Sequence, residues 1–471
     1  MCSQGARFYW GHIAMSVRRK RVIVILPHLG IGGAQRVGSC MADHLAAIGH
    51  DVTVVTILSK PPADFYRLSA SVNRVLLGEH RSSERSSGRL SLPRAYYRRF
   101  RLRFPRLCLA YADIPLVAKH SMCVKYVTAA KLLVAKRLVK LIGVCAQHKV
   151  FGKSYGPYAV MLRYTHWRAR AVHIYLKSSK PDVVLSLLGS ANIITVAASH
   201  GLPHRVVISE RNDPSRQTLS SPWEELRPLL YPGADVVTAN SWGALDSMRA
   251  YCPAEKLAYL PNPLILNNRI ADNARSNSFL FLGRLVDQKA PEILLKAFAL
   301  VSPNLESWRL HFAGDGPMAE RLKCLAKELK VEDYVSFHGL VQDPTALLKS
   351  CKVFVLPSRF EGTPNALLEA MGHGMPCIIS DASPGPLKLV EHRRSGLVVK
   401  TGCPKTLADA LHELAVSEEL RTRLSQTAFE RVREFGLDVV AATWENILFR
   451  NHSIPDKACV LVSTGAETHL H

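Results

Sequence analysis

A short apolar run that leads into a glycine-rich turn and a helix is the feature that most constrains this fold. Val353–Leu356 is continuously apolar, which is typical of a strand buried on both faces. The turn Glu361–Pro364 follows, and a helix is predicted to begin at Asn365. Such a unit places backbone N–H groups and the positive end of a helix at the carboxyl edge of a parallel sheet, where open α/β folds bind ligands.

Two glutamates frame this turn. Glu361 and Glu369 are separated by seven residues. A carboxylate can accept two hydroxyl hydrogen bonds, so a pair of glutamates suits a polyhydroxylated ligand such as a sugar. The spacing alone is a weak motif, and a surface helix that happens to carry two acids is the alternative interpretation.

Strand-like and helix-like segments alternate along the chain, which predicts parallel sheets in doubly wound α/β domains. Near the N-terminus, Val22–Pro27 is predicted to be a buried strand, Gly30–Gly33 a turn and Asp51–Ile57 the next strand. The other predicted strands are Asp182–Leu188, Arg205–Ser209, Asp235–Ala239, a strand beginning at Phe279, Leu310–Ala313, Val335–His338, Cys377–Ser380 and Leu397–Val399.

The length of 471 residues exceeds what one hydrophobic core usually serves, so we expect two or more domains. Residues 261–277 are rich in asparagine and proline and are the predicted linker. The first domain is then 20–262 and the second is 277–434. The closing segment Ala428–Arg450 is predicted to be one helix.

The net charge of +23 is concentrated in one segment. Residues 81–180 contain 22 lysines and arginines against two acids, a surplus of 20. We interpret 85–175 as a basic helical insertion in the first domain. Its partner could be an anionic membrane surface, a nucleic acid or an acidic substrate. Two interpretations of this segment remain open: an amphipathic helix that lies on a bilayer, and a helix packed in the core with a solvated basic side.

Cysteine usage and hydropathy point to the cytoplasm. The eleven cysteines are scattered and include no C-x-x-C pair, so neither a structural zinc site nor a disulfide framework is expected. We find neither a secretory signal nor a run of 18 uncharged apolar residues. An Asp-x-Asp motif at a strand end is also missing, so no metal site is predicted.

Three further motifs precede the segment that contains Glu361 and Glu369. Phe281–Leu285 with Lys289, then Ala313–Pro317, then Phe337–Val341 precede Arg359–Met371. Together they resemble the nucleotide-sugar half of a family 4 glycosyltransferase of GT-B fold, similar to bacterial polysaccharide-biosynthesis members. Near the N-terminus, Gly32–Arg36 resembles the G-G-A-E-R segment of that family, with Gln35 in place of its glutamate.

The resemblance implies a donor site built from both domains. Arg284 and Lys289 would supply the charge that neutralises a departing nucleotide diphosphate, without a metal. Glu361 would contact the donor hexose, and Glu369 would hold the ribose hydroxyls. The remaining expected donor-binding residues supply backbone groups: Gly33, Gly283, Gly314, Gly339, Leu340, Val341, Gly362, Thr363, Pro364 and Asn365. Catalytic roles are thus expected for Glu361, Arg284 and Lys289. The donor would be a UDP or GDP sugar, and no other cofactor is implied.

On the acceptor side the sequence departs from the family. Many members place a histidine where this chain has Ser209-Glu210-Arg211, although some bacterial polysaccharide transferases carry a similar segment. Glu210 and Arg211 are therefore acceptor-side candidates. The resemblance also implies that 435–450 crosses back as a helix to the acceptor-binding first domain.

The expected function is retaining transfer of a hexosyl unit from a nucleotide sugar to a glycan or a lipid-linked saccharide, in surface polysaccharide or glycoconjugate biosynthesis. The expected location is cytoplasmic, with peripheral attachment at the cytoplasmic face of the membrane as an open possibility. A nucleotide-sugar epimerase of the same fold is one alternative. A basic nucleic-acid-binding protein is another, but the basic segment lacks RNA-binding motifs, so no nucleic-acid partner is predicted.

Overall fold

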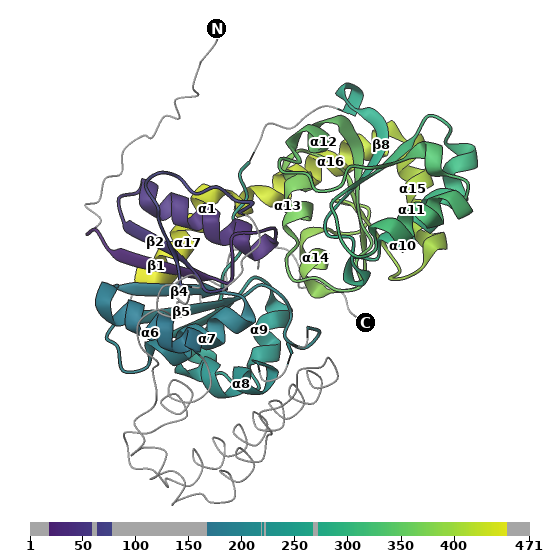
Figure 1. The fold of residues 1–471 in the computed structure, drawn as a ribbon. Helices are drawn as coiled ribbons and strands as arrows, with labels where there is room; N and C mark the ends of the chain where they lie inside the picture. Colours follow the sequence, from purple (N-terminus) through teal and green to yellow (C-terminus); the bar gives the residue numbers. More distant parts are fainter. Residues whose placement is uncertain are drawn as a thin grey trace, which may run out of the picture.

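The computed structural model describes residues 18–58, 64–77, 167–217, 219–220, 223–266 and 272–449. These residues form two parallel β-sheets, each covered by helices on both faces (Figure 1). The α/β prediction is therefore confirmed. Most of the predicted basic insertion, 85–166, lies outside the described residues, and only its end belongs to a described helix, α6 (Trp167–Ser179).

The first sheet has seven strands in the order β3-β2-β1-β4-β5-β6-β7, and every pair is parallel. Its strand order reverses between β1 and β4, the place where doubly wound sheets bind ligands. The strands are β1 (Arg21–Leu26), β2 (Asp51–Thr56), β3 (Asn73–Leu76), β4 (Val183–Leu187), β5 (Arg205–Glu210), β6 (Val236–Ala239) and β7 (Leu257–Tyr259).

Strand β1 shows why this sheet is buried on both sides. Val22, Val24 and Leu26 join the core under α1, whereas Ile23 and Ile25 join the core under α6 and α7. Alternate residues of a strand point to opposite faces, so a continuous apolar run supplies both cores. The first-domain helices besides α6 are α1 (Gly33–Ala47), α7 (Gly189–Ser199), α8 (Trp223–Leu230) and α9 (Trp242–Met248).

The second sheet has six strands in the order β10-β9-β8-β11-β12-β13 and is also fully parallel. Strand β8 begins at Ser276, earlier than the predicted Phe279, because Ser276 already pairs with Cys351. The order reverses between β8 and β11. The strands are β8 (Ser276–Leu282), β9 (Arg309–Ala313), β10 (Val335–Phe337), β11 (Cys351–Leu356), β12 (Cys377–Ser380) and β13 (Leu397–Val399).

The helices of the second domain include the one predicted to begin at Asn365. That helix is α13 (Asn365–Gly372), and its start is confirmed. The helices α13 and α14 lie on the side of this domain that is turned toward the first domain (Figure 1). The others are α10 (Pro291–Val301), α11 (Ala319–Glu328), α12 (Thr345–Ser350), α14 (Pro384–Leu389), α15 (Pro404–Val416) and α16 (Glu418–Val432).

The closing segment is not the single helix predicted for Ala428–Arg450. Helix α16 ends at Val432, and α17 (Leu437–Phe449) begins after a short break. The linker residue Leu264 causes the break, because its N–H donates to Phe435 O at 2.8 Å and its carbonyl accepts from Leu437 N–H at 2.9 Å. Helix α17 then packs against β4 and β5 of the first sheet.

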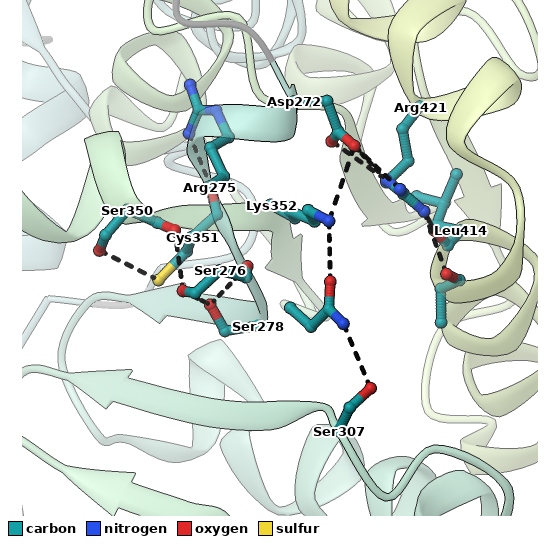
Figure 2. Close-up of polar contacts among 12 residues, drawn as sticks. Asp272, Arg275, Ser276, Ser278, Ser307, Ser350, Cys351, Lys352, Leu414 and Arg421 are labelled. Atoms are coloured by element: carbon teal, nitrogen blue, oxygen red, sulfur yellow. Dashed lines mark hydrogen bonds and ion pairs between the residues drawn. The ribbon is translucent and has the colours of Figure 1, made fainter.

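A buried charge network fixes the second domain where the linker enters it (Figure 2). Asp272 lies opposite Arg421 of α16, with Arg421 Nη2 at 2.9 Å and Nε at 3.0 Å from its carboxylate oxygens. Arg421 Nη1 also donates to the Leu414 carbonyl at 2.7 Å, and Lys352 Nζ lies 3.8 Å from Asp272. This network connects the linker to α16, α15 and β11.

None of the helices in 18–58, 167–266 or 272–449 combines the length and the apolar character that a membrane-crossing segment requires.

Candidate functional site

Two oppositely charged side chains meet at the carboxyl ends of β8 and β11, where the second sheet reverses its strand order. Lys289 Nζ lies 2.6 Å from Glu361 Oε1. The side chains of Lys289 and Glu361 are only 15% and 8% exposed, so the pair is largely shielded from water. The structure thus brings together two of the three predicted catalytic residues, which are 72 positions apart in the chain.

Arg359 holds the two loops that carry this pair. Its Nη2 donates to Glu292 Oε1 at 2.6 Å and its Nε donates to the Asp287 carbonyl at 3.1 Å. Its backbone N–H donates to Gln288 O at 2.8 Å. The short 3₁₀ helix Asp287–Lys289 is therefore tied to the turn that contains Glu361. Arg359 belongs to the motif Arg359–Met371, but the sequence pattern alone did not indicate this tethering role.

Gly314 brings three loops of the second sheet together. A Cβ atom on Gly314 would lie 1.9 Å from Gly283 O, so only glycine allows these backbones to approach. Its N–H donates to Gly339 O at 2.8 Å. The glycines predicted after β8, β9 and β10 are therefore adjacent at one edge of the sheet. Leu340, beside Gly339, is one of the exposed large apolar side chains.

Arg284 follows β8 directly, and its side chain is exposed. Among the described residues, none forms a hydrogen bond or an ion pair with its guanidinium group. It lies in the same loop as Gly283, which is packed against Gly314. Arg284 therefore has no counter-charge among the described residues, whereas one of the three N–H donors of Lys289 is already used by Glu361.

The turn before α13 is anchored to the first domain and to the linker. Thr363 Oγ1 donates to the Asn240 carbonyl at the end of β6. Asn262 Nδ2 donates to Thr363 O at 2.9 Å and to Asn365 Oδ1 at 2.6 Å. Asn365 Nδ2 reaches Gly33 O at 3.1 Å. The predicted donor residues Gly33, Thr363 and Asn365 thus lie together, and Asn262 between two linker prolines joins them.

Glu369, one turn into α13, is paired with Arg36 of α1. The Arg36 Nη1 atom contacts Glu369 Oε1, and the Glu369 side chain is only 8% exposed. Burial raises the pKa of the Glu369 carboxyl group, and the neighbouring Arg36 charge acts in the opposite direction. Arg36 could not be recognised as a partner of Glu369 from the sequence, because no local pattern connects residues in different domains.

Gln35, which replaces the glutamate of the resembled family, is buried in the first domain. Its Nε2 lies 3.3 Å from His28 Nε2, while His28 Nδ1 accepts the Gly30 N–H at 3.0 Å. Burial lowers the pKa of His28, which favours the neutral imidazole. Gln35 and His28 therefore stabilise the glycine-rich turn through the hydrogen bond to Gly30.

Glu210, an acceptor-side candidate, is enclosed in the first domain. It accepts a hydrogen bond from the Tyr231 hydroxyl, and its Oε1 lies 3.9 Å from Arg227 Nε. Burial raises the pKa of its carboxyl group. With 4% of the residue exposed, Glu210 offers an acceptor little access.

Arg211, the other acceptor-side candidate, holds the linker. Its Nη1 donates to Leu260 O at 3.0 Å and to Asn262 Oδ1 at 2.8 Å, and its guanidinium lies 5.0 Å from the Trp444 ring centroid. Burial lowers its pKa to about 9. These contacts place Arg211 at the junction of the first domain, the linker and α17.

The chemistry of this edge is that of a site for a phosphorylated polyol. Cations stand at the end of β8, backbone N–H groups point from the start of α13, and two buried carboxylates lie nearby. Over the described ranges, no three histidine, cysteine or acidic side chains are grouped so as to hold a metal ion.

Comparisons with known proteins agree with this chemistry. Residues 266–431 match the family model described as glycosyl transferases group 1. A Campylobacter jejuni enzyme named GalNAc-alpha-(1->4)-GalNAc-alpha-(1->3)-diNAcBac-PP-undecaprenol alpha-1,4-N-acetyl-D-galactosaminyltransferase is 30% identical over 279 residues, which are 58% of this chain and 76% of the relative. The lipopolysaccharide 1,6-galactosyltransferase of Salmonella typhimurium is 30% identical over 36% of this chain and 49% of its own length.

Solved structures share the fold over almost the whole chain. A TarM variant from S. aureus, in complex with UDP and other ligands, superposes with a TM-score of 0.65 at 12% identity, covering 92% of this chain and 100% of that one. Anabaena HepE in complex with UDP and glucose gives a TM-score of 0.63 at 14% identity, covering 91% and 99%. At this level of identity the comparison concerns the fold alone.

Proposed function

This chain belongs to the group 1 glycosyltransferases, and from that premise we propose that it is a retaining, metal-independent hexosyltransferase that uses a nucleotide-diphosphate sugar. The family membership confirms the predicted glycosyltransferase activity, and the superposed structures confirm the predicted GT-B fold. Neither the epimerase nor the nucleic-acid-binding alternative finds support among the relatives.

The observation that carries the mechanism is the position of Lys289 and Arg284 at one sheet edge, with Glu361 2.6 Å from Lys289 Nζ. As the bond between the sugar C1 and the diphosphate oxygen breaks, its electron pair stays on the diphosphate. Arg284 and Lys289 stabilise that negative charge, and the start of α13 adds its N–H groups. Two cations and a helix terminus can stabilise the leaving diphosphate, as a metal ion does in other transferases.

Retention would follow from attack on the same face that the diphosphate leaves. The acceptor hydroxyl oxygen forms the new bond to C1, and its proton passes to an oxygen of the departing diphosphate. This route needs no side-chain nucleophile. Glu361 would instead bind a hydroxyl of the donor hexose, since the contact with Lys289 holds its carboxylate in place.

The remaining donor contacts are assigned by position. Glu369 would hold the ribose hydroxyls, and the amides of Gly362–Asn365 together with Gly33 would approach the diphosphate. The backbone of Gly339–Val341 would face the base. UDP is the proposed nucleotide, because the superposed HepE and TarM structures both contain it.

A donor panel tests this proposal. Purified protein is incubated with UDP and GDP sugars in excess EDTA, without acceptor, and release of free nucleotide is measured. We expect slow hydrolysis of one UDP sugar at a rate that EDTA leaves unchanged. Loss of turnover in EDTA that magnesium or manganese restores would contradict the metal-free phosphate site. Failure to hydrolyse or bind any sugar nucleotide would contradict the donor assignment itself.

For the acceptor we propose a lipid-linked saccharide or lipopolysaccharide of surface polysaccharide biosynthesis, bound by the first domain. The C. jejuni relative is named for an undecaprenyl-diphosphate-linked saccharide and the Salmonella relative for lipopolysaccharide. Such acceptors are presented at a membrane, so the proposed location is the cytoplasm, with peripheral attachment to the cytoplasmic face of that membrane.

A membrane-facing surface is consistent with the end of the basic segment. On α6 the exposed side chains Arg170, Ile174 and Lys177 recur at helical spacing on one face. They continue the charge surplus of 81–180, most of which lies outside the described residues. Each basic side chain near an anionic bilayer contributes about 1 kcal/mol, which salt weakens.

Liposome flotation checks this surface. We expect binding to anionic vesicles at low salt, weaker binding at 1 M salt and little binding to neutral vesicles. Replacing Lys136, Arg137 and Lys140 together by glutamine should reduce flotation while donor hydrolysis stays unchanged. Equal binding to neutral and anionic vesicles, or binding to neither, would rule the surface out.

A further inference from the structure

We propose that Arg36 is a diphosphate-binding residue supplied by the first domain, and that it exchanges between Glu369 and the donor. This inference rests on the donor site proposed above, since it assigns a further residue to it. In the exchange the hydroxyl groups of the donor ribose bind the Glu369 carboxylate, and the Arg36 guanidinium group binds the diphosphate instead. Arg36 would then make the site select nucleotides over nucleosides.

The first observation is that the N-terminal turns of α1 and α13 touch at two successive points. Asn365 Nδ2 donates to Gly33 O at 3.1 Å, where both helices begin. One turn further along, Arg36 of α1 meets Glu369 of α13. Figure 1 shows these two helices next to each other across the domain boundary. The partial positive charges of two helix starts are thus directed to one region.

The second observation is the unequal burial of the ion pair. The Glu369 side chain is 8% exposed, whereas that of Arg36 is 41% exposed. The carboxylate is therefore fixed in the second domain, and the guanidinium enters from the solvent side. Because Arg36 is the residue that can move, a ligand that binds Glu369 through hydroxyl groups displaces Arg36 and leaves the carboxylate in place.

The third observation is where a displaced Arg36 remains. Its backbone N–H donates to Gly32 O at 3.0 Å, so the residue is anchored to the glycine-rich turn. The proposed diphosphate position lies between Gly33 and the start of α13, next to that anchor. A guanidinium group suits this ligand, because it can give two parallel hydrogen bonds to phosphate oxygens.

The magnitudes favour exchange over simple blocking. Breaking a half-exposed ion pair such as Arg36–Glu369 lowers the affinity of a ligand by no more than about fivefold. A charge-assisted contact with a phosphate contributes about tenfold to a hundredfold. For a donor with a diphosphate, the contact with Arg36 therefore increases the affinity more than competition for Glu369 decreases it. A nucleoside has no phosphate, so Arg36 only decreases its affinity.

The test compares uridine with UDP on the wild type and on Arg36→Gln, by titration calorimetry for UDP and ligand-observed NMR for uridine. The variant should bind uridine up to about fivefold more tightly, because Glu369 is no longer occupied. The ratio of the uridine Kd to the UDP Kd should fall by about tenfold to a hundredfold, since this ratio isolates the diphosphate contact. Arg36→Lys should retain part of the ratio.

The matched control is Arg249→Gln, which removes an exposed arginine at the far end of α9 and should leave both constants unchanged. If Arg36→Gln changes both affinities by the same factor, in a protein with an unchanged melting temperature, the diphosphate role is wrong. If the wild type binds neither UDP nor GDP, the proposed donor site fails, and this inference fails with it.

Discussion

Replacing Lys289 with methionine should lower the rate of sugar transfer by about a hundredfold to a thousandfold, the usual cost of removing one charged transition-state partner. The same change should lower the free energy of unfolding by about 3 kcal/mol, because it leaves the buried Glu361 carboxylate without its partner. Nucleotide release measures the first effect, and urea unfolding measures the second.

A double variant separates the two effects. Adding Glu361→Gln to Lys289→Met removes the uncompensated charge, so stability should return toward the wild-type value while activity stays low. Arg284→Ala is the natural comparison, since that exposed side chain has no partner among the described residues. It should lose a similar factor in rate and change stability by less than about 0.5 kcal/mol. Wild-type turnover by a folded Lys289→Met or Arg284→Ala protein would remove these residues from the mechanism.

Replacing Asp272 with alanine should destabilise the protein by about 3–5 kcal/mol, because it leaves Arg421 buried without a counter-charge. The side chains of Asp272 and Arg421 are 10% and 5% exposed. Two carbonyl acceptors, Leu414 O and Ala415 O, remain for one nitrogen of Arg421 but do not balance its charge. Urea unfolding of the purified variant measures the loss.

Asp246→Ala is the control for this change, because Asp246 forms an exposed ion pair with Arg249 three residues away. It should cost less than about 1 kcal/mol. Combining Asp272→Ala with Arg421→Met should recover part of the stability lost by the single change. A loss for Asp272→Ala no greater than that for Asp246→Ala would show that the network contributes little to the fold.

Local patterns predicted most of the fold. The apolar run Val22–Pro27 and the segment Asp51–Ile57 correspond to β1 and β2. Strand β1 could be recognised because a strand buried on both faces is apolar at nearly every position, as Val22–Leu26 is. The helix predicted through Gly436 failed, because a distant residue, Leu264, pairs with the backbone on both sides of it.

The prediction of the site was most complete within the second domain, although Gly33 of the first domain was also predicted and lies beside Asn365. Lys289 and Glu361 follow two strands that neighbour each other across the switch point, so their proximity follows from the topology. Arg36 and Asn262 were missed because their contacts depend on how the two domains and the linker meet. Glu210 was an acceptor-side candidate because its segment stands where family members place a histidine, but that position did not reveal that its side chain is buried.

The path of α17 has a consequence for how the protein is made. Trp444 is completely buried in the core of the first domain, beside Val440, Ala441 and Leu448, although it lies near the end of the described chain. The first domain therefore leaves the ribosome with part of its core missing. At 5–20 residues per second, the roughly 190 residues between Leu260 and Phe449 take about 10–40 s to synthesise. Throughout that interval the nascent first domain exposes an apolar groove, which a chaperone or the surface of the ribosome must shield.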